Sequence, residues 1–254
     1  MNQLKTLGVA VAAFGMTAAL VPAQAADTFS VKAGGRVQLD AALGDSDDEL
    51  LQNNSGSEVR RVRTFLKGKG FGILDYKIQY DFDQGGDNTD FADVYLRIKA
   101  GGGKLWLGNI NQPFGMSEHQ SSKYTNFMER SFTSQAVDIG RARSIAYSWS
   151  NNRIWWMASA FSQENDISDD NERLGVTARF AYNAMKTDTN VLHFGASAAR
   201  QETGGFRGVR YRTNYHLMDD RIDARLEEEN AENFESPTQF AVEFAGAFGP
   251  VTVM

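Results

Sequence analysis

The chain is a series of short segments in which apolar and polar residues alternate. The clearest is ILDYKIQYDFDQ (73–84), where every second residue is large and apolar or aromatic and the residues between are polar. A period of two residues predicts a β-strand with one apolar and one hydrated face. The pattern fits two settings: a protein core with water outside, or lipid outside with a water-filled lumen inside.

The same alternation recurs along most of the chain. It predicts ten complete strands and the start of an eleventh, at 28–43, 58–69, 73–83, 90–100, 103–111, 141–150, 153–162, 172–183, 190–200, 238–248 and from Val251. No helical period stands out after residue 25. The sequence therefore predicts an all-β chain.

The connections between these strands are alternately short and long. The short ones lie around Gly70, at Gly101–Gly103 and at Asn151–Asn152, whereas the segments 44–57, 112–140 and 201–237 are long. Short turns at one end and long loops at the other are typical of an outer-membrane β-barrel. Strands of about ten residues also match the length of a membrane crossing. Six aromatic residues near strand ends are expected to form interfacial girdles: Trp106, Tyr147, Trp149, Trp155, Trp156 and Phe161.

The N-terminus predicts export. Lys5 precedes an apolar run from Leu7 to Val21, and Ala23-Gln24-Ala25 follows. This order is typical of a secretory signal peptide over residues 1–25. The alternative is an N-terminal membrane anchor, although the apolar run is short for a span.

Composition and motifs argue against several other classes. The 254 residues include no Cys and carry a formal net charge of −6, which disfavours disulfides, thiolate metal sites and a nucleic-acid partner. The three histidines lack paired spacing, and no G-x-S-x-G motif occurs. We therefore expect no catalytic centre, no metal site and no cofactor, so the chain is not expected to be an enzyme.

Four segments in order resemble the phosphate-selective porin O and P family: GGRVQLD (34–40), VRRVRTFLKGKGFGILDYKIQYDFD (59–83), FADVYLRI (91–98) and LGNINQPFGMSEHQSSKYTNFMERS (107–131). The resemblance extends along almost all of the mature chain and is strongest over 34–131. It implies an antiparallel transmembrane β-barrel of the 16-stranded porin type in the bacterial outer membrane. It also implies a homotrimer that lets phosphate or other small anions diffuse through.

The predicted strand count is smaller than the resemblance implies. Single-chain bacterial barrels have an even number of strands, and an open sheet edge is not tolerated in lipid. We therefore expect residues 26–254 to be the N-terminal portion of a porin barrel, of roughly 10–11 strands. A natural short barrel is the alternative.

The alternation places a set of basic residues on the lumen side: Arg61, Arg63, Lys67, Lys69, Lys77, Arg97, Lys99, Arg173 and Arg179. The resemblance marks Arg60, Arg61 and Lys77 as candidates for an anion-attracting lining. Arg60 falls on the opposite face of the period, so its inclusion requires a β-bulge or a position at the rim. Carboxylates share the same lumen, at Asp75, Asp81, Asp83 and Asp93, and are expected to pair with some of these cations.

Two further groups of candidates come from the resemblance. It implies that loop 112–140 folds inward and narrows the channel, with a constriction motif at Ser121, Ser122, Lys123 and Arg130. Phosphate-specific members carry a lysine where this chain has His119. In FRGVRYR (206–212), the residues Arg207, Arg210 and Arg212 resemble an arginine ladder that draws anions toward the constriction.

The function predicted is a water-filled channel for passive diffusion of phosphate or other small anions, with outer-membrane lipid as surroundings. The alternative is a general diffusion porin or an adhesin-like barrel without anion preference, and a soluble lectin-like sandwich is a third possibility. The charge of the constriction distinguishes the first two. Basic residues such as Lys123 and Arg130 lining it would favour anions, whereas Glu118, Glu129 and Asp138 would not.

Overall fold

The computed structural model describes residues 29–42, 56–82, 90–124, 130–131, 134, 139–162, 174–201, 208–210, 223–225 and 238–253. The predicted signal peptide at 1–25 lies outside these residues.

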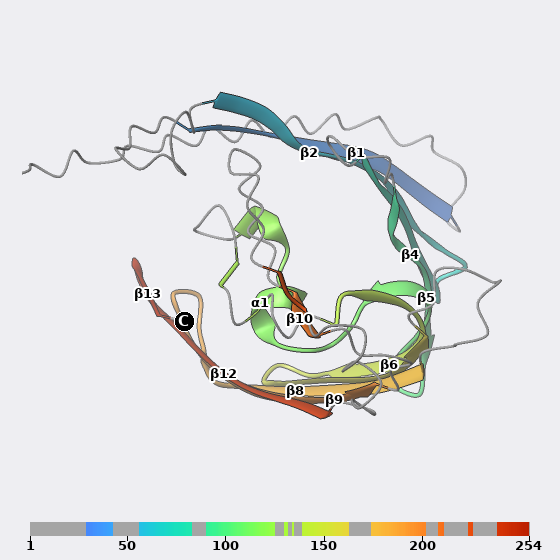
Figure 1. The fold of residues 1–254 in the computed structure, drawn as a ribbon. Helices are drawn as coiled ribbons and strands as arrows, with labels where there is room; N and C mark the ends of the chain where they lie inside the picture. The colour runs from blue at the N-terminus through green and yellow to red at the C-terminus, as the bar shows by residue number, and fades with distance from the viewer. Residues whose placement is uncertain are drawn as a thin grey trace, which may run out of the picture.

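Eleven strands form one antiparallel sheet in which almost every strand pairs with its neighbours in the chain. The strands are β1 (Phe29–Ala42), β2 (Gly56–Gly70), β3 (Leu74–Phe82), β4 (Asp90–Ala100), β5 (Gly103–Asn111), β6 (Arg141–Ser150), β7 (Ile154–Ser162), β8 (Leu174–Lys186), β9 (Asn190–Gln201), β12 (Thr238–Phe248) and β13 (Val251–Val253). The sheet curves around a concave space, with β1 and β13 at its two edges (Figure 1).

This architecture confirms the all-β prediction and the positions of the strands. The largest difference is at β8, which was predicted to end at residue 183 and extends to Lys186. The pairing of β8 with β9 shifts between Asn183 and Met185. A β-bulge adds a residue and reverses the alternation beyond it, which hides the end of a strand from a strict period of two.

Residues 201–237 were predicted to be a long loop, and this was incomplete. Two three-residue strands, β10 (Gly208–Arg210) and β11 (Asp223–Arg225), pair with each other as a separate two-stranded sheet. Three residues are too few for a period of two to be recognised.

Helical structure is short in the described part of the chain. It consists of α1 (Met116–His119) and the 3-10 helix η2 (Ser122–Tyr124), with a further helical residue at 134. Among the described residues, no helix is long and apolar enough to span a membrane.

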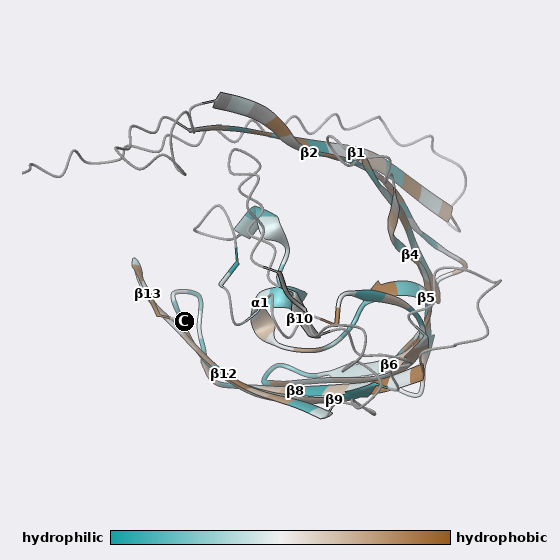
Figure 2. Cartoon of the chain, viewed as in Figure 1, coloured by the Kyte–Doolittle hydropathy of each residue, from teal (hydrophilic) through white to brown (hydrophobic). Residues whose placement is uncertain are grey.

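The outward face of the sheet is apolar and exposed. The side chains of Phe240 and Val242 on β12 are 77% and 90% exposed, and Ile145 on β6 is 62% exposed. Large apolar side chains at this level of exposure are unfavourable in water and suit a lipid environment. Figure 2 shows hydrophobic and hydrophilic residues next to one another along the strands.

The prediction of aromatic girdles holds for only some of the six residues. Tyr147 and Trp156 contact each other on the outward face, with ring centroids 5.6 Å apart. Trp106 instead donates to the lumen-facing Ser148, and Phe161 is buried beneath the inward loop. Proximity to a strand end does not fix the face, because the face depends on the register of the alternation.

Gly108 on β5 allows β4 and β5 to approach closely. Its φ is +130°, and a Cβ atom there would overlap the carbonyl oxygen of Val94 and lie 2.9 Å from the Cα of Tyr95. We expect Gly108→Ala to lower the free energy of unfolding by about 2 kcal/mol, measured by urea titration of protein in lipid vesicles. Gly72→Ala is the control, because its φ is +70° but no atom lies within 4 Å of the added Cβ; a loss of about 1 kcal/mol is expected there. Equal losses in the two variants would contradict the close-approach argument.

Candidate channel constriction

The segment that follows β5 turns into the concave space instead of extending outward. Residues 112–124, which include α1 and η2, lie inside the curve of the sheet (Figure 1). The chain has to leave β5 with its backbone polar groups satisfied, because it enters a buried position against the wall.

Gln112 anchors this segment to the wall. Its side-chain amide donates from Nε2 to the Ile110 carbonyl and to Ser144 Oγ, each at 3.1 Å. Its Oε1 accepts a hydrogen bond of 2.7 Å from Ser159 Oγ. The Gln112 side chain is fully buried. A buried amide with both ends satisfied fixes one orientation, since any other leaves polar groups without partners.

The next residues seat the loop on strands β6 to β9. Phe114 packs in a buried cluster with Ile139, Ala142, Phe161 and Ala199. Thr177 Oγ1 donates to the Pro113 carbonyl at 3.2 Å, and the Gly115 N–H donates to Ser197 Oγ at 3.1 Å. The inward folding that the resemblance implied is therefore present, and its basis is this set of contacts.

Arg130 closes the loop on itself. Its Nη1 forms an ion pair of 3.0 Å with Oε2 of the buried Glu118, and its Nη2 donates to the Gln120 carbonyl at 2.7 Å. Asn111 holds the same region by donating to the Glu118 carbonyl at 2.7 Å. Glu118 thus balances the charge of Arg130, which acts in part as a clamp on the loop.

Ser122 meets the opposite wall of the concave space. Arg36 of β1 donates from Nη2 to Ser122 Oγ at 2.9 Å, and Arg61 of β2 donates from Nη1 to the same oxygen at 3.4 Å. Arg61 also donates to Gln38 Oε1 at 3.2 Å. Two guanidinium groups and one hydroxyl therefore converge where the loop and the wall approach each other.

Arg36 was absent from the predicted site. It lies in GGRVQLD (34–40), which served only to identify the family resemblance. Arg36 alternates with Val37 and shares its face with Gln38, so the period of two could have placed it in the lumen. Among the described residues, no carboxylate lies within ion-pair distance of Arg36.

Several other basic residues of the described wall are paired with carboxylates, whereas Lys67, Lys69 and Lys99 form no such pair among the described residues. Arg63 Nε donates to Asp81 at 2.6 Å. Lys77 Nζ and Arg141 Nε contact the two oxygens of Asp93 at 2.5 and 2.8 Å, and Arg97 contacts Asp75 at 2.8 Å. The predicted sharing of the lumen by acids and bases is confirmed for Asp75, Asp81 and Asp93, while Asp83 lies outside the described residues. The site around Ser122 differs from these pairs because two guanidinium groups meet a hydroxyl oxygen there.

The remaining predicted residues are placed as follows. Ser121 is exposed, and the ammonium group of the exposed Lys123 lies 4.7 Å from the centre of the Tyr124 ring. Arg60 is the extra residue of a bulge, since Gln38 pairs with Arg61 and Leu39 with Val59. A bulge was one of the two conditions expected for Arg60 to face the lumen; its side chain lies outside the described residues. Arg207, Arg212 and the side chain of Arg210 lie outside the described residues.

His119 is enclosed between the loop and the wall. Its ring centroid lies 5.6 Å from that of Trp155, and its Nδ1 is buried without a partner among the described residues. Burial lowers its pKa from 6.5 to about 4, and the nearby positive charge of Arg179 acts in the same direction. His119 is consequently neutral at pH 7 and does not supply the positive charge that a lysine would.

Below the loop, a buried cluster surrounds Glu243 of β12. Arg179 of β8 donates from Nη2 to Glu243 at 2.6 Å, and both side chains are 7% exposed. His193 Nε2 lies 2.9 Å from the same carboxylate, while its Nδ1 contacts Asn183. Within the described part of the chain, no three His, Cys, Asp or Glu residues are grouped closely enough to hold a metal ion.

Comparison with known proteins identifies the family. The model of the phosphate-selective porin O and P family matches residues 31–252. The chain belongs to this family. It is also similar to an uncharacterised protein of Caulobacter vibrioides, 24% identical over 210 residues. That alignment covers 76% of the chain and 42% of the relative, so the chain spans less than half of the relative's length.

Membership places the porin chain in the outer membrane and in a family of channels. The apolar outward face of the sheet agrees with this location. The inward loop and the Ser122 contacts then lie on the lumen side of a porin wall.

Loop docking in this porin is expected to depend on pH through His119. The docked ring has a pKa of about 4, while a released ring has about 6.5. Protons therefore favour release as the pH falls from 6.5 to 4, and docking is unaffected above 6.5. At pH 5 the docking free energy should be weaker by about 2 kcal/mol. Open-channel current fluctuations should increase between pH 7 and pH 5, whereas the His119→Gln variant should show the same fluctuations at both values; equal pH dependence would contradict the assignment.

Proposed function

We propose that the chain supplies the wall and the constriction of a water-filled channel through which phosphate or other small anions diffuse passively. The observation that carries this proposal is the convergence of Arg36 and Arg61 on Ser122 Oγ, at 2.9 and 3.4 Å. The wall and the loop each contribute groups that can bind an anion, at the point where they meet.

The chemistry of these groups suits a partly dehydrated anion. A guanidinium group is planar, stays charged and can donate two parallel hydrogen bonds to the oxygens of one anion. An entering anion would replace Ser122 Oγ as acceptor for Arg36 and Arg61, and the hydroxyl could then donate to the anion. Rapid passage requires that each such contact is weak enough to be exchanged.

A second candidate function is a general diffusion porin, favoured by the paired wall. The carboxylates Asp75, Asp81 and Asp93 balance Arg97, Arg63, Lys77 and Arg141. Where cations and carboxylates of the wall pair, their fields largely cancel and attract anions and cations alike, so those parts of the wall would contribute little to selectivity.

Two expectations from the resemblance complete the proposal. We propose that three copies assemble into a trimer. We also propose that Arg207, Arg210 and Arg212 line the entrance above the constriction as a ladder. Arg210 and Arg212 are two residues apart, so in an extended segment they would project to the same side about 7 Å apart, a spacing at which an anion can move from one guanidinium group to the next.

The test is the reversal potential of single channels in a potassium chloride gradient, with and without added phosphate. The whole protein would be reconstituted in planar bilayers. The expected result is an anion-selective potential, with chloride current blocked by phosphate at millimolar concentration or below. A potential near zero or of cation-selective sign, without block, would reject the anion channel and support the general diffusion porin.

A further inference from the structure

The outward face of the sheet contains a pocket unrelated to the lumen. It has a volume of about 570 Å³ and lies over strands β5 to β9 and the start of β12. Its floor is formed by alanines on three adjacent strands, Ala158 and Ala160 on β7, Ala178 on β8 and Ala198 on β9. Tyr147 and Ile145 of β6 border this floor on one side. The small residues thus create a depression in an otherwise bulky apolar surface.

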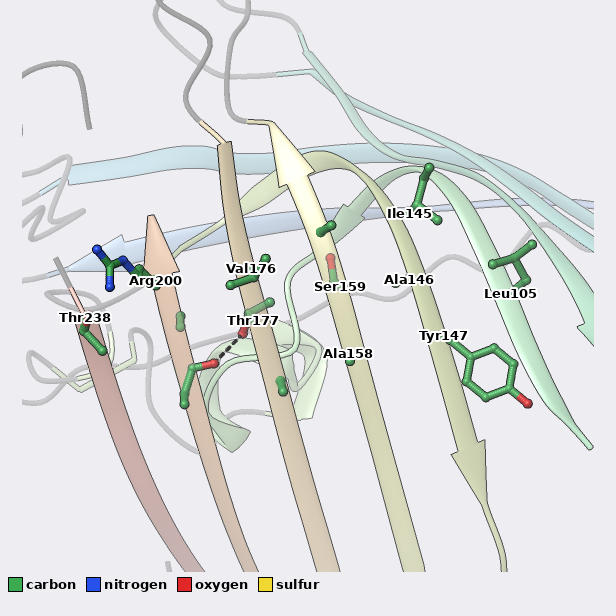
Figure 3. A pocket seen from close by; sticks show the side chains of 14 residues that line it. Leu105, Ile145, Ala146, Tyr147, Ala158, Ser159, Val176, Thr177, Arg200 and Thr238 are labelled. Carbon is green, nitrogen blue, oxygen red and sulfur yellow. Dashed lines mark hydrogen bonds between the residues drawn. The ribbon is translucent and has the colours of Figure 1, made fainter. Parts of the chain in front are cut away.

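One end of the pocket is charged. Arg200 and Thr238 lie there, while Leu105 and Tyr147 lie at the opposite end (Figure 3). Arg200 is exposed and shares the outward face of β9 with Ala198. It is the second-last residue of β9, directly before the long connection at 202–237. In a porin the long loops are external, so Arg200 lies toward the outer leaflet of the membrane.

The charges on this face have one sign. The outward-facing positions of β5 to β9 and β12 include no Asp or Glu. Their basic residues are Arg141, Arg143 and Arg200, of which Arg141 is paired with Asp93 of β4. All three arginines lie toward the loop ends of their strands. Among the described residues, Arg200 has no carboxylate within ion-pair distance. An anion that reaches this end of the pocket can therefore pair with Arg200 without displacing a carboxylate of the described residues.

We propose that this pocket binds a phosphorylated acyl lipid of the outer leaflet, with the phosphate on Arg200 and one acyl chain along the alanine floor. The path from Arg200 to Tyr147 crosses three strand spacings and two residues along a strand, roughly 15 Å. The pocket therefore offers an acyl chain an apolar path that begins at a cation.

A second copy of the chain fits the pocket less well. Covering Arg200 with the apolar outward face of another copy would remove a charge from water and headgroups without a carboxylate to pair it, which is costly. A phosphorylated lipid provides both parts of the fit: its phosphate pairs with Arg200, and its acyl chain fills the depression.

The experiment is native mass spectrometry of the whole protein in mild detergent, titrated with purified lipid A as the phosphorylated acyl lipid. Two variants test the two halves of the site: Arg200→Gln removes the cation and Ala178→Trp fills the floor. Their matched controls are Arg153→Gln, an exposed cation at the β6–β7 turn, and Ala33→Trp on the outward face of β1. Heat-dependent migration on gels checks that each variant is folded.

The proposal expects lipid A to bind the folded wild type, with affinity about tenfold lower for Arg200→Gln and binding abolished in Ala178→Trp. Removing the phosphates from lipid A should weaken its binding to the wild type by the same factor, about tenfold, as the Arg200→Gln substitution does. Equal binding by the Arg200→Gln and Arg153→Gln variants would overturn the proposal. It would also be overturned if Ala178→Trp dissociated the subunits while lipid binding stayed unchanged, because the pocket would then be a subunit contact.

Discussion

Replacing Arg36 and Arg61 together by glutamine is expected to lower the anion-over-cation permeability ratio about tenfold. The two guanidinium groups converge on Ser122 Oγ at 2.9 and 3.4 Å, where the loop and the wall meet. Two unit charges at a narrow, partly hydrated point change ion energies by on the order of 1 kcal/mol each. Arg36→Glu with Arg61→Glu should reverse the preference to cations. Reversal potentials in a salt gradient measure both changes.

Lys67→Gln is the matched control for this prediction. Lys67 is a basic residue of the same strand on the same face, six residues from Arg61 and therefore roughly 20 Å away along β2. Its ammonium group lies 5.1 Å from the centre of the Phe65 ring. A similar fall in selectivity for Lys67→Gln and for the double variant would show that total lumen charge, not the Ser122 site, sets selectivity.

Glu243→Gln is expected to lower the free energy of unfolding by about 3–5 kcal/mol. Arg179 and Glu243 are each 7% exposed and contact at 2.6 Å. Removing the carboxylate leaves the arginine charge buried without a counter-charge, which costs more than the ion pair itself contributes. His193 also loses a partner at 2.9 Å. The measurement is urea-induced unfolding in lipid vesicles, followed by tryptophan fluorescence.

Two comparisons make this second prediction specific. Asp75→Asn breaks the Arg97–Asp75 pair, whose side chains are 25% and 14% exposed, and should cost about 1 kcal/mol because lumen water solvates the remaining charge. Arg179→Met combined with Glu243→Gln should recover part of the loss, since no buried charge remains unpaired. If Glu243→Gln cost no more than Asp75→Asn, burial of the pair would not be the source of its effect.

The strands were predictable because the two faces of this sheet meet different solvents, lipid on the outside and water in the lumen. In β3, five apolar or aromatic residues alternate with polar ones along Leu74–Phe82, and the structure reproduces that strand to within a residue of its predicted bounds. The bulge at Arg60 was one of two alternatives that the alternation left open, and the pairing of β1 with β2 shows that it is present. The end of β8 was missed, since the alternation changes phase at Asn183.

The site was less predictable, because its contacts join residues far apart in the chain. Arg36 and Ser122 are separated by 86 positions, and no local pattern relates them. The same holds for Arg130, whose motif indicated an anion-binding cation but whose partner Glu118 became clear only from the folded loop. His119 was noted for replacing a lysine, whereas its neutral state follows from burial against Trp155.

The loop joins two walls that face each other across the lumen: Gln112 is fixed to β6 and β7, and Ser122 is held by β1 and β2. In mechanical terms it is a cross-brace, and the contacts of the Ser122 hydroxyl with Arg36 and Arg61 contribute to its stiffness at one end. An anion that takes Arg36 and Arg61 away from Ser122 weakens that end of the brace while it passes. The cross-section of the barrel should then be most deformable when the pore is occupied, so bilayer tension would alter conductance more in phosphate than in its absence.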